Sequence, residues 1–364
     1  MIQYIEEALV PGAPVCVVHF RSRTKQAEGF EKYPTPPGVS NIYVNNGSSG
    51  WYLDGLPGYG DARASALAIK AKAQAAGASK IVCVGASMGA FGAAMFSSIM
   101  GAELICFAPE LWLNVYTGFS RRDVPGRTLD IATMGQPSRA LFVAGISCPT
   151  DLICALHFHR AWPNSEAIFL PDCGHESARH LKDKELLAPL LADFCFGRDL
   201  AQYKALSVPM SILEGCPTVP PKQLNRATMV AFVEALTRHL LLSDRVRMAD
   251  RLAGEKCFAA AVPLIGKIRA EHGEIAEVHM LDATVHRKQQ RHAESIEALQ
   301  KVEHLPEFRC EALWLRGMAL EQLGRVDEAL RAYLLLLQEG KGNREWKLTA
   351  KAAAVRVAAL SSPA

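Results

Sequence analysis

Short apolar runs alternate with longer amphipathic segments between the N-terminus and Leu170. Runs rich in β-branched residues predict buried strands, and segments with apolar residues three or four positions apart predict helices. The strands are expected at 15–20, 42–44, 80–84, 104–107, 140–145 and 167–170, and the helices at 61–76, 90–100 and 152–160. Since the strands are apolar along their whole length, we expect a parallel sheet covered by helices on both faces.

The pattern changes near residue 200. Prolines cluster between 201 and 225, which predicts a linker that no regular element crosses. From Arg226 onward the apolar spacing is almost wholly helical. The sequence therefore predicts an α/β domain over 1–200, a linker over 201–225 and an all-α domain over 226–364.

The strand at 80–84 runs into Gly-Ala-Ser-Met-Gly, and a run of small and apolar residues with helical character follows. A serine on a sharp turn between a strand and a helix exposes its hydroxyl at the edge of the sheet. Gly85 and Gly89 stand where a side chain would collide as the backbone folds back. The pattern predicts that Ser87 is a nucleophile, although a tight turn with a purely structural serine can have the same sequence.

A serine nucleophile needs a base, and a carboxylate must hold that base in one tautomer. In an open parallel sheet such groups lie on loops at the carboxyl ends of strands. The loop after 140–145 supplies Asp151, and the loop after 167–170 supplies Asp172 and His175. We expect His175 to be the base and favour Asp151 over Asp172 as the acid, because Asp172 can equally cap a turn.

The order Ser87, Asp151, His175, with the acid one strand before the last and Gly174-His175 just after it, resembles the α/β-hydrolase fold from the N-terminus to about residue 200. The resemblance implies an oxyanion hole that uses the backbone N–H of Met88 and a second N–H from the loop after the first strand, at Phe20 or Arg21. The family's usual His-Gly is His19-Phe20 in this chain.

Three further residues are candidates for the substrate pocket: His19, Trp51 and Asp54. Each also has a structural interpretation. His19 stands at the end of a strand, where a histidine is commonly structural, and Trp51 and Asp54 belong to a loop, rich in glycine and aromatic residues, that could simply pack on the core.

A second resemblance lies in the helical third. Gly317, Ala329 and Tyr333 take the small, small and aromatic positions of a tetratricopeptide repeat, where two antiparallel helices touch. Steps of that motif's period, about 34 residues, place Ala283, Ser295, Leu299 and then Ala249, Ala261, Ile265 at the same positions. The earlier units are degenerate, because His286 and Gln290 replace Leu320 and Gly324. Such an array implies a surface for a protein or peptide partner, or a contact that dimerises the chain or packs on the first domain.

Composition narrows the function classes. A formal net charge of +3 with scattered basic residues argues against nucleic acid or an anionic membrane as the partner. The N-terminus lacks the features of a secretory signal, so we expect a cytoplasmic protein. The ten cysteines include no Cys-x-x-Cys pair, and we expect reduced, mostly buried thiols and no metal.

The sequence thus predicts a serine hydrolase that cleaves an ester or thioester in a small or acylated substrate through an acyl-Ser87 intermediate, without a cofactor. Two alternatives remain open. The first domain could be an inactive scaffold or adaptor beside the repeats, or the same triad could transfer the acyl group to an alcohol instead of water.

Overall fold

The computed structural model describes residues 4–23, 30–47, 49–114, 123–127, 129, 131–217, 225–340 and 346–361. The chain forms two compact units, Met1–Leu240 and Leu241–Ala364. The first contains a mostly parallel sheet with helices and the second is helical, so the predicted order of an α/β part followed by an all-helical part is confirmed. The first unit extends past the expected boundary, since it includes helix α9 (Arg226–Thr237).

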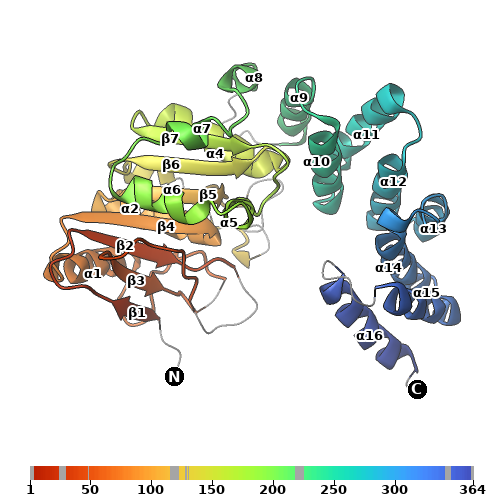
Figure 1. The fold of residues 1–364 in the computed structure, drawn as a ribbon, viewed down its shortest axis with the longest axis horizontal. Helices are drawn as coiled ribbons and strands as arrows, with labels where there is room; N and C mark the ends of the chain where they lie inside the picture. Colours follow the sequence, from red (N-terminus) through yellow and green to blue (C-terminus); the bar gives the residue numbers. More distant parts are fainter. Residues whose placement is uncertain are drawn as a thin grey trace. The chain divides into compact units, whose positions relative to one another are not determined.

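Seven strands form one sheet in the order β1-β3-β2-β4-β5-β6-β7 (Figure 1). Their bounds are β1 Ile5–Ala8, β2 Val15–Phe20, β3 Ser40–Val44, β4 Lys80–Ser87, β5 Glu103–Pro109, β6 Ala140–Gly145 and β7 Ser165–Leu170. All neighbours pair in parallel except β1, which runs antiparallel to β3. The purely parallel sheet expected from the sequence is therefore wrong at this edge. With two glutamates in four residues, β1 lacks the apolar run that marks the other strands.

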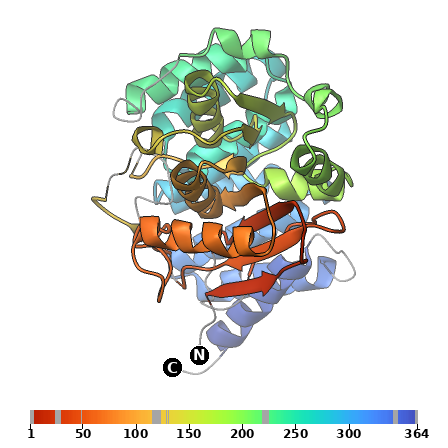
Figure 2. The ribbon, with the colours of Figure 1, turned by 90° about the vertical axis from the view of Figure 1, so that its left-hand side faces the viewer.

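Helices cover both faces of the sheet. On one face α5 (Ser177–Asp183) and α6 (Leu187–Cys195) pack on the alternate strand residues that include Val17, Val84 and Val143. The opposite face carries α1 (Ala62–Ala75), α2 (Met88–Met100) and α4 (Pro149–Ala161). Figure 2 shows α1, in orange, beside the red strands that form the β1 edge. This two-sided covering explains why the inner strands are apolar throughout.

The remaining segments of the first unit are short. Residues 110–138 contain one 3₁₀ helix, η1 (Ile131–Met134), among the residues described there. The expected linker carries two short helices, α7 (Ala201–Lys204) and α8 (Met210–Glu214), and its residues 218–224 lie outside the described part. The sequence predicted a linker that no regular element crosses, and both short helices lie within its bounds. Neither has more than five residues.

The second unit is built from helix pairs. Its elements are α10 Leu242–Gly254, α11 Phe258–His272, α12 Ala276–Lys288, α13 His292–Gln300, α14 Pro306–Gln322, α15 Val326–Glu339 and α16 Lys347–Ser361. The turn inside each pair recurs at a constant interval, because Lys256, Gln290 and Gly324 all have positive φ, at 62°, 63° and 71°. The turn therefore keeps a positive φ in the earlier units, although Lys256 and Gln290 replace the glycine.

The hydrogen bond after each turn and the buried contacts within each helix pair recur at the same interval. The backbone N–H of the residue after each turn position donates to a carbonyl five residues earlier, at 2.7, 2.8 and 3.0 Å in the three pairs. All nine positions picked from the sequence are buried: Ala249, Ala261, Ile265, Ala283, Ser295, Leu299, Gly317, Ala329 and Tyr333. The helix pairs thus touch at the residues expected for a repeat.

Gly317 gives a test of this packing. A Cβ at Gly317 would lie 2.4 Å from Cε1 of Tyr333, whose ring is fully buried. We expect Gly317→Ala to lower the free energy of unfolding by about 1–3 kcal/mol, because the ring has no room to move. Urea unfolding followed by circular dichroism measures the change.

Gly266, inside α11, is the matched control, because nothing lies within 4 Å of a Cβ placed there. Gly266→Ala should raise the free energy of unfolding by up to about 1 kcal/mol, since alanine restricts the unfolded chain. Changes of the same sign in both variants would contradict the packing described here.

Candidate functional site

The turn at Ser87 joins β4 to α2. Ser87 has φ 53° and ψ −121°, a conformation that is costly for a residue with a side chain. A Cβ at Gly85 would lie 2.2 Å from the carbonyl oxygen of Gly89, and one at Gly89 would lie 2.5 Å from that of Phe20. The two glycines are therefore required by close backbone contacts. The turn leaves Ser87 only half-buried at the carboxyl end of β4.

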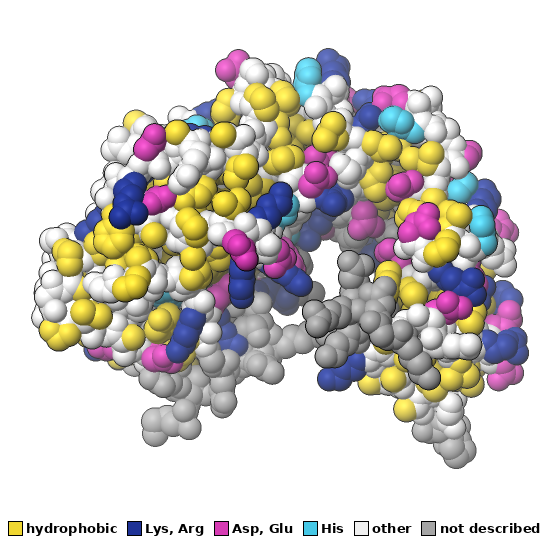
Figure 3. Space-filling model, viewed as in Figure 1, with side chains coloured by type: hydrophobic (Ala, Val, Ile, Leu, Met, Phe, Trp, Pro, Cys, Tyr) yellow, Lys and Arg dark blue, Asp and Glu magenta, His cyan; other side chains and the backbone are white. Residues whose placement is uncertain are grey.

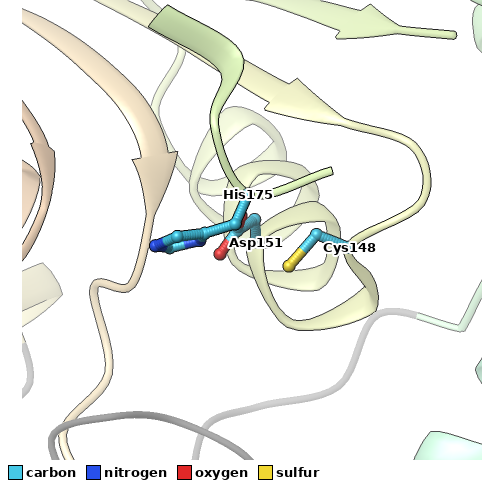
Figure 4. Close-up of side chains that lie close together, drawn as sticks. All are labelled: Cys148, Asp151 and His175. Atoms are coloured by element: carbon cyan, nitrogen blue, oxygen red, sulfur yellow. The ribbon is translucent and has the colours of Figure 1, made fainter. Parts of the chain in front are cut away.

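His175 and Asp151 lie together, although 24 residues separate them in sequence. The distance from His175 Nδ1 to Asp151 Oδ2 is 2.8 Å, and the Asp151 side chain is 2% exposed. Since a carboxylate only accepts, Nδ1–H donates this bond and the other ring nitrogen keeps its lone pair. Figure 4 shows that second nitrogen pointing away from Asp151. The imidazole is thus held in the tautomer that a general base needs.

The position of Asp151 follows from helix α4. It lies in the first turn, two residues after Pro149 at the start of the helix. Unpaired N–H groups and the helix dipole favour a negative charge at this end. Asp172, the alternative acid, is exposed and sits at φ 52° in the turn before His175. Of the two aspartates, Asp151 is the one that pairs with His175 Nδ1.

The loop that carries His175 is fastened to the neighbouring strands. Ser177 Oγ donates to the carbonyl of Val143 at 2.9 Å and accepts from the backbone N–H of Ala108 at 3.0 Å. A Cβ at Gly145 would lie 2.2 Å from the carbonyl oxygen of Gly174, so the end of β6 lies against this loop. Sequence reasoning missed both roles, because an isolated serine and a glycine at a strand end carry no distinctive pattern.

Ser87 and His175 lie at the same edge of the sheet. Ser87 is in register with Pro109 of β5, and the preceding residue of β5, Ala108, bonds to Ser177. No hydrogen bond joins Ser87 Oγ to His175 among the described side chains. The contact expected between Asp151 and His175 is present, and the contact expected between His175 and Ser87 stays a prediction.

The expected oxyanion donors differ in their availability. Met88 is the first residue of α2, where a backbone N–H has no acceptor within the helix. The N–H of Arg21 donates to the carbonyl of Val44 at 3.2 Å, and Phe20 lies within β2, paired on both sides. The N–H of Ser22 donates to Glu31 Oε2 at 2.8 Å. The second donor from the first loop therefore stays a prediction that this conformation does not realise.

Of the three candidate pocket residues, His19 and Trp51 are fully buried. Trp51 Nε1–H donates to Asp123 Oδ2 at 3.3 Å. Asp54 has a side chain that is 77% exposed and an ion pair with Arg127 at 2.9 Å. Asp54 also lines a cavity of about 380 Å³ whose lining includes no residue of the expected triad. We find no contact that brings any of the three to Ser87 within the described part of the chain.

His19 is held as a neutral structural group. The backbone N–H of Tyr33 donates to its Nδ1 at 3.2 Å, so Nε2–H donates to Asn41 Oδ1 at 2.9 Å. The ring lies beside those of Tyr33 and Tyr43. The pKa of His19 is lowered from 6.5 to about 4, chiefly by burial; the hydrogen bond with Asn41 opposes this shift and the charge of Lys32 adds to it.

The lowered pKa of His19 predicts an acid-sensitive stability. As the pH falls from 6.5 towards 4, His19 becomes protonated in the unfolded chain but stays neutral in the folded protein. The free energy of unfolding should fall by up to roughly 3 kcal/mol over this window from His19 alone. Urea unfolding at several pH values should show a shallower fall for His19→Gln, whereas His239→Gln, an exposed control, should match the wild type. Equal slopes in all three proteins would contradict the assignment.

Cys148 adds a thiol to the acid and base pair. One ligand atom each from Cys148, Asp151 and His175 lies within 4.8 Å of the others, and Figure 4 shows the three side chains together. Donors bound to one tetrahedral zinc ion lie roughly 3.3 Å apart. The 2.8 Å between Asp151 and His175 is instead a hydrogen-bond distance. All ten cysteines are buried and none of them forms a disulfide, and the expected absence of a metal stays a prediction.

The surface charge and the hydropathy of the helices do not indicate a further site. Basic and acidic side chains are intermingled on the face drawn in Figure 3, over the residues it colours by type. No helix among the described residues is long and apolar enough to cross a membrane.

Comparisons with protein-family models, with curated proteins and with solved structures found no match. The site must therefore be interpreted from its own residues.

Proposed function

We propose that the first unit is a serine hydrolase of the α/β-hydrolase type, which cleaves an ester or thioester through an acyl-Ser87 intermediate. The observation that carries this proposal is the buried Asp151 carboxylate bonded to His175 Nδ1 at the sheet edge where the Ser87 turn lies. Buried carboxylates are uncommon unless they are paired, and a histidine oriented in this way beside a strained serine is suited to acyl transfer.

The reaction follows from these roles. His175 Nε2 takes the proton of the Ser87 hydroxyl while Oγ attacks the carbonyl carbon, and Asp151 stabilises the imidazolium that forms. The backbone N–H of Met88 donates to the developing oxyanion. His175 then gives its proton to the leaving group, and in the second half it activates water against the acyl-enzyme. The mechanism needs no organic cofactor or metal.

The apolar pattern of residues 110–138 predicts no long helix that would form a large lid. A small or flexible acyl group is therefore the proposed substrate class. A panel of p-nitrophenyl acetate, butyrate and octanoate, with a butyryl thioester, tests this choice. We expect the short esters to be cleaved fastest. Adding a primary alcohol and analysing products separates hydrolysis from acyl transfer, and no turnover of any member would contradict the proposal.

A catalytically inactive scaffold is the second candidate, because specific observations favour it. Ser87 and His175 are not hydrogen-bonded, and the N–H groups of Arg21 and Ser22 are both engaged. In an inactive protein, Ser87 and His175 would stay unbonded, and the N–H groups of Arg21 and Ser22 would keep their present acceptors, when an acyl ligand is added. In an enzyme, the substrate carbonyl oxygen must be able to displace the present acceptor from at least one of these two N–H groups.

For the second unit we propose a tetratricopeptide-like array that binds a protein partner or a second copy of the chain. Support comes from the regular recurrence of the turns and buried contacts, with α16 following the third pair as a capping helix. Such arrays stack their units into an extended binding surface.

A further inference from the structure

A cavity of about 770 Å³ lies in the helical unit. Its lining comes from the turn between α10 and α11, the end of α12, the turn into α13 with the first residue of α13, one face of α14, and α16. Among the lining residues are four cationic side chains and one carboxylate, Glu321: the cations are Lys256, Arg287, Lys288 and Arg356. This excess of positive charge contrasts with the mixed charge of the molecular face in Figure 3.

The one carboxylate in the lining already has partners. Glu321 Oε1 accepts from Arg356 Nε at 2.9 Å and from the Tyr333 hydroxyl at 2.5 Å. Glu321 therefore offsets Arg356, and the charges of Lys256, Arg287 and Lys288 are left without a carboxylate of their own in the lining.

Two of these cations act against the charge of the third, Lys288. The pKa of Lys288 is lowered by burial first and then by the charges of Arg287 and Lys256. Asp250 is the carboxylate that opposes the shift, and burial raises the pKa of Asp250 itself. Burial and two neighbouring cations thus disfavour the charged form of Lys288. A ligand that brings negative charge would relieve this repulsion.

One buried donor of a lining residue has no acceptor. Arg287 Nε has no hydrogen-bond partner among the described residues. A guanidinium also carries further N–H groups and matches a carboxylate in geometry and charge.

An apolar strip lies beside the cations. Trp314 and Met318 are one turn apart on α14, so their side chains share a face, and both are half-buried. Gln290 and Gln322, also in the lining, are exposed, and each can both donate and accept. A peptide backbone needs both functions, whereas a phosphate group only accepts.

We propose that this cavity binds an acidic peptide segment of a partner protein, with Asp or Glu carboxylates on Arg287 and Lys288 and an adjacent apolar side chain on Trp314 and Met318. The inference rests on the partner-binding role proposed for the helical unit and is independent of catalysis at Ser87. Its basis is the complementarity of a cationic cluster and an apolar strip within one cavity.

The test is a selection with the full-length protein. A phage-displayed library of random 12-residue peptides is panned against the wild type, and the most enriched sequence is synthesised for fluorescence anisotropy. We expect enrichment of Asp and Glu next to an apolar residue, and affinity that falls as salt is added. Arg287→Glu/Lys288→Glu should weaken binding at least about 30-fold, because two charge-assisted hydrogen bonds become repulsive.

Two more variants make the result specific. Lys301→Glu reverses an exposed charge outside the cavity and should bind like the wild type. Lys256→Glu, at an exposed turn, should weaken binding without disturbing a helix, which matters if the double variant unfolds. Enrichment without acidic residues, no enrichment at all, or equal binding by the cavity variants would overturn the proposal. Displacement of the peptide by inorganic pyrophosphate, with no effect of Trp314→Ala, would point instead to a phosphate ligand and also overturn it.

Discussion

Ser87→Ala is expected to lower kcat/KM for a short p-nitrophenyl ester at least about a thousandfold. Its hydroxyl is the only atom assigned to attack the carbonyl, and the loss of a nucleophile removes the covalent route altogether. The strained turn should persist, because alanine keeps the Cβ that the φ of 53° already accommodates. Initial rates of p-nitrophenol release measure the effect.

Ser79→Ala provides the control for this loss, since Ser79 is exposed immediately before β4. Its kcat/KM should stay within about twofold of the wild type, as is usual for surface positions. Residual turnover of Ser87→Ala close to that of the wild type would show that the esterase activity arises elsewhere.

Asp151→Asn is expected to lower kcat by about 10⁴-fold. The amide has the size of the carboxylate, but its NH₂ group can donate to His175 Nδ1 and so favours the wrong tautomer. KM should change much less than kcat, because Asp151 is buried behind the imidazole. Steady-state kinetics with the same ester separate the two constants.

Asp172→Asn is the matched control, because Asp172 is the exposed aspartate nearest to His175 in sequence. It should retain kcat within a few-fold of the wild type. If Asp172→Asn were the damaging change and Asp151→Asn the harmless one, the observed pair of Asp151 with His175 would be structural and the roles would have to be exchanged.

Much of the candidate site could be predicted, because its chemistry imposes local patterns. A Cβ at either glycine beside Ser87 would lie within 2.5 Å of a backbone oxygen, so both are visible in sequence as Gly-x-Ser-x-Gly. His175 and Asp151 follow consecutive strands, and the carboxyl ends of parallel strands meet at one edge. The repeat could be predicted for the same reason, since Gly317 must leave room for Tyr333.

Other features depend on contacts that carry no pattern. Edge strand β1 pairs through its backbone and needs no apolar run. The bond from the Ser22 N–H to Glu31 joins residues of a loop whose path the sequence does not specify. The cationic cavity gathers Lys256 and Lys288 from two helix pairs and Arg356 from α16. Its excess of positive charge therefore has no counterpart in the sequence, where the basic residues are scattered.

The most direct test of the central claim is covalent labelling with a fluorophosphonate, followed by intact mass measurement and peptide mapping. Hydrolysis of an ester through Ser87 predicts one phosphonyl group per chain, located on the peptide that contains Ser87. Labelling should be much slower in Asp151→Asn, whose histidine cannot activate the hydroxyl. A folded wild-type protein that stays unlabelled, or an adduct on another residue, would contradict the account.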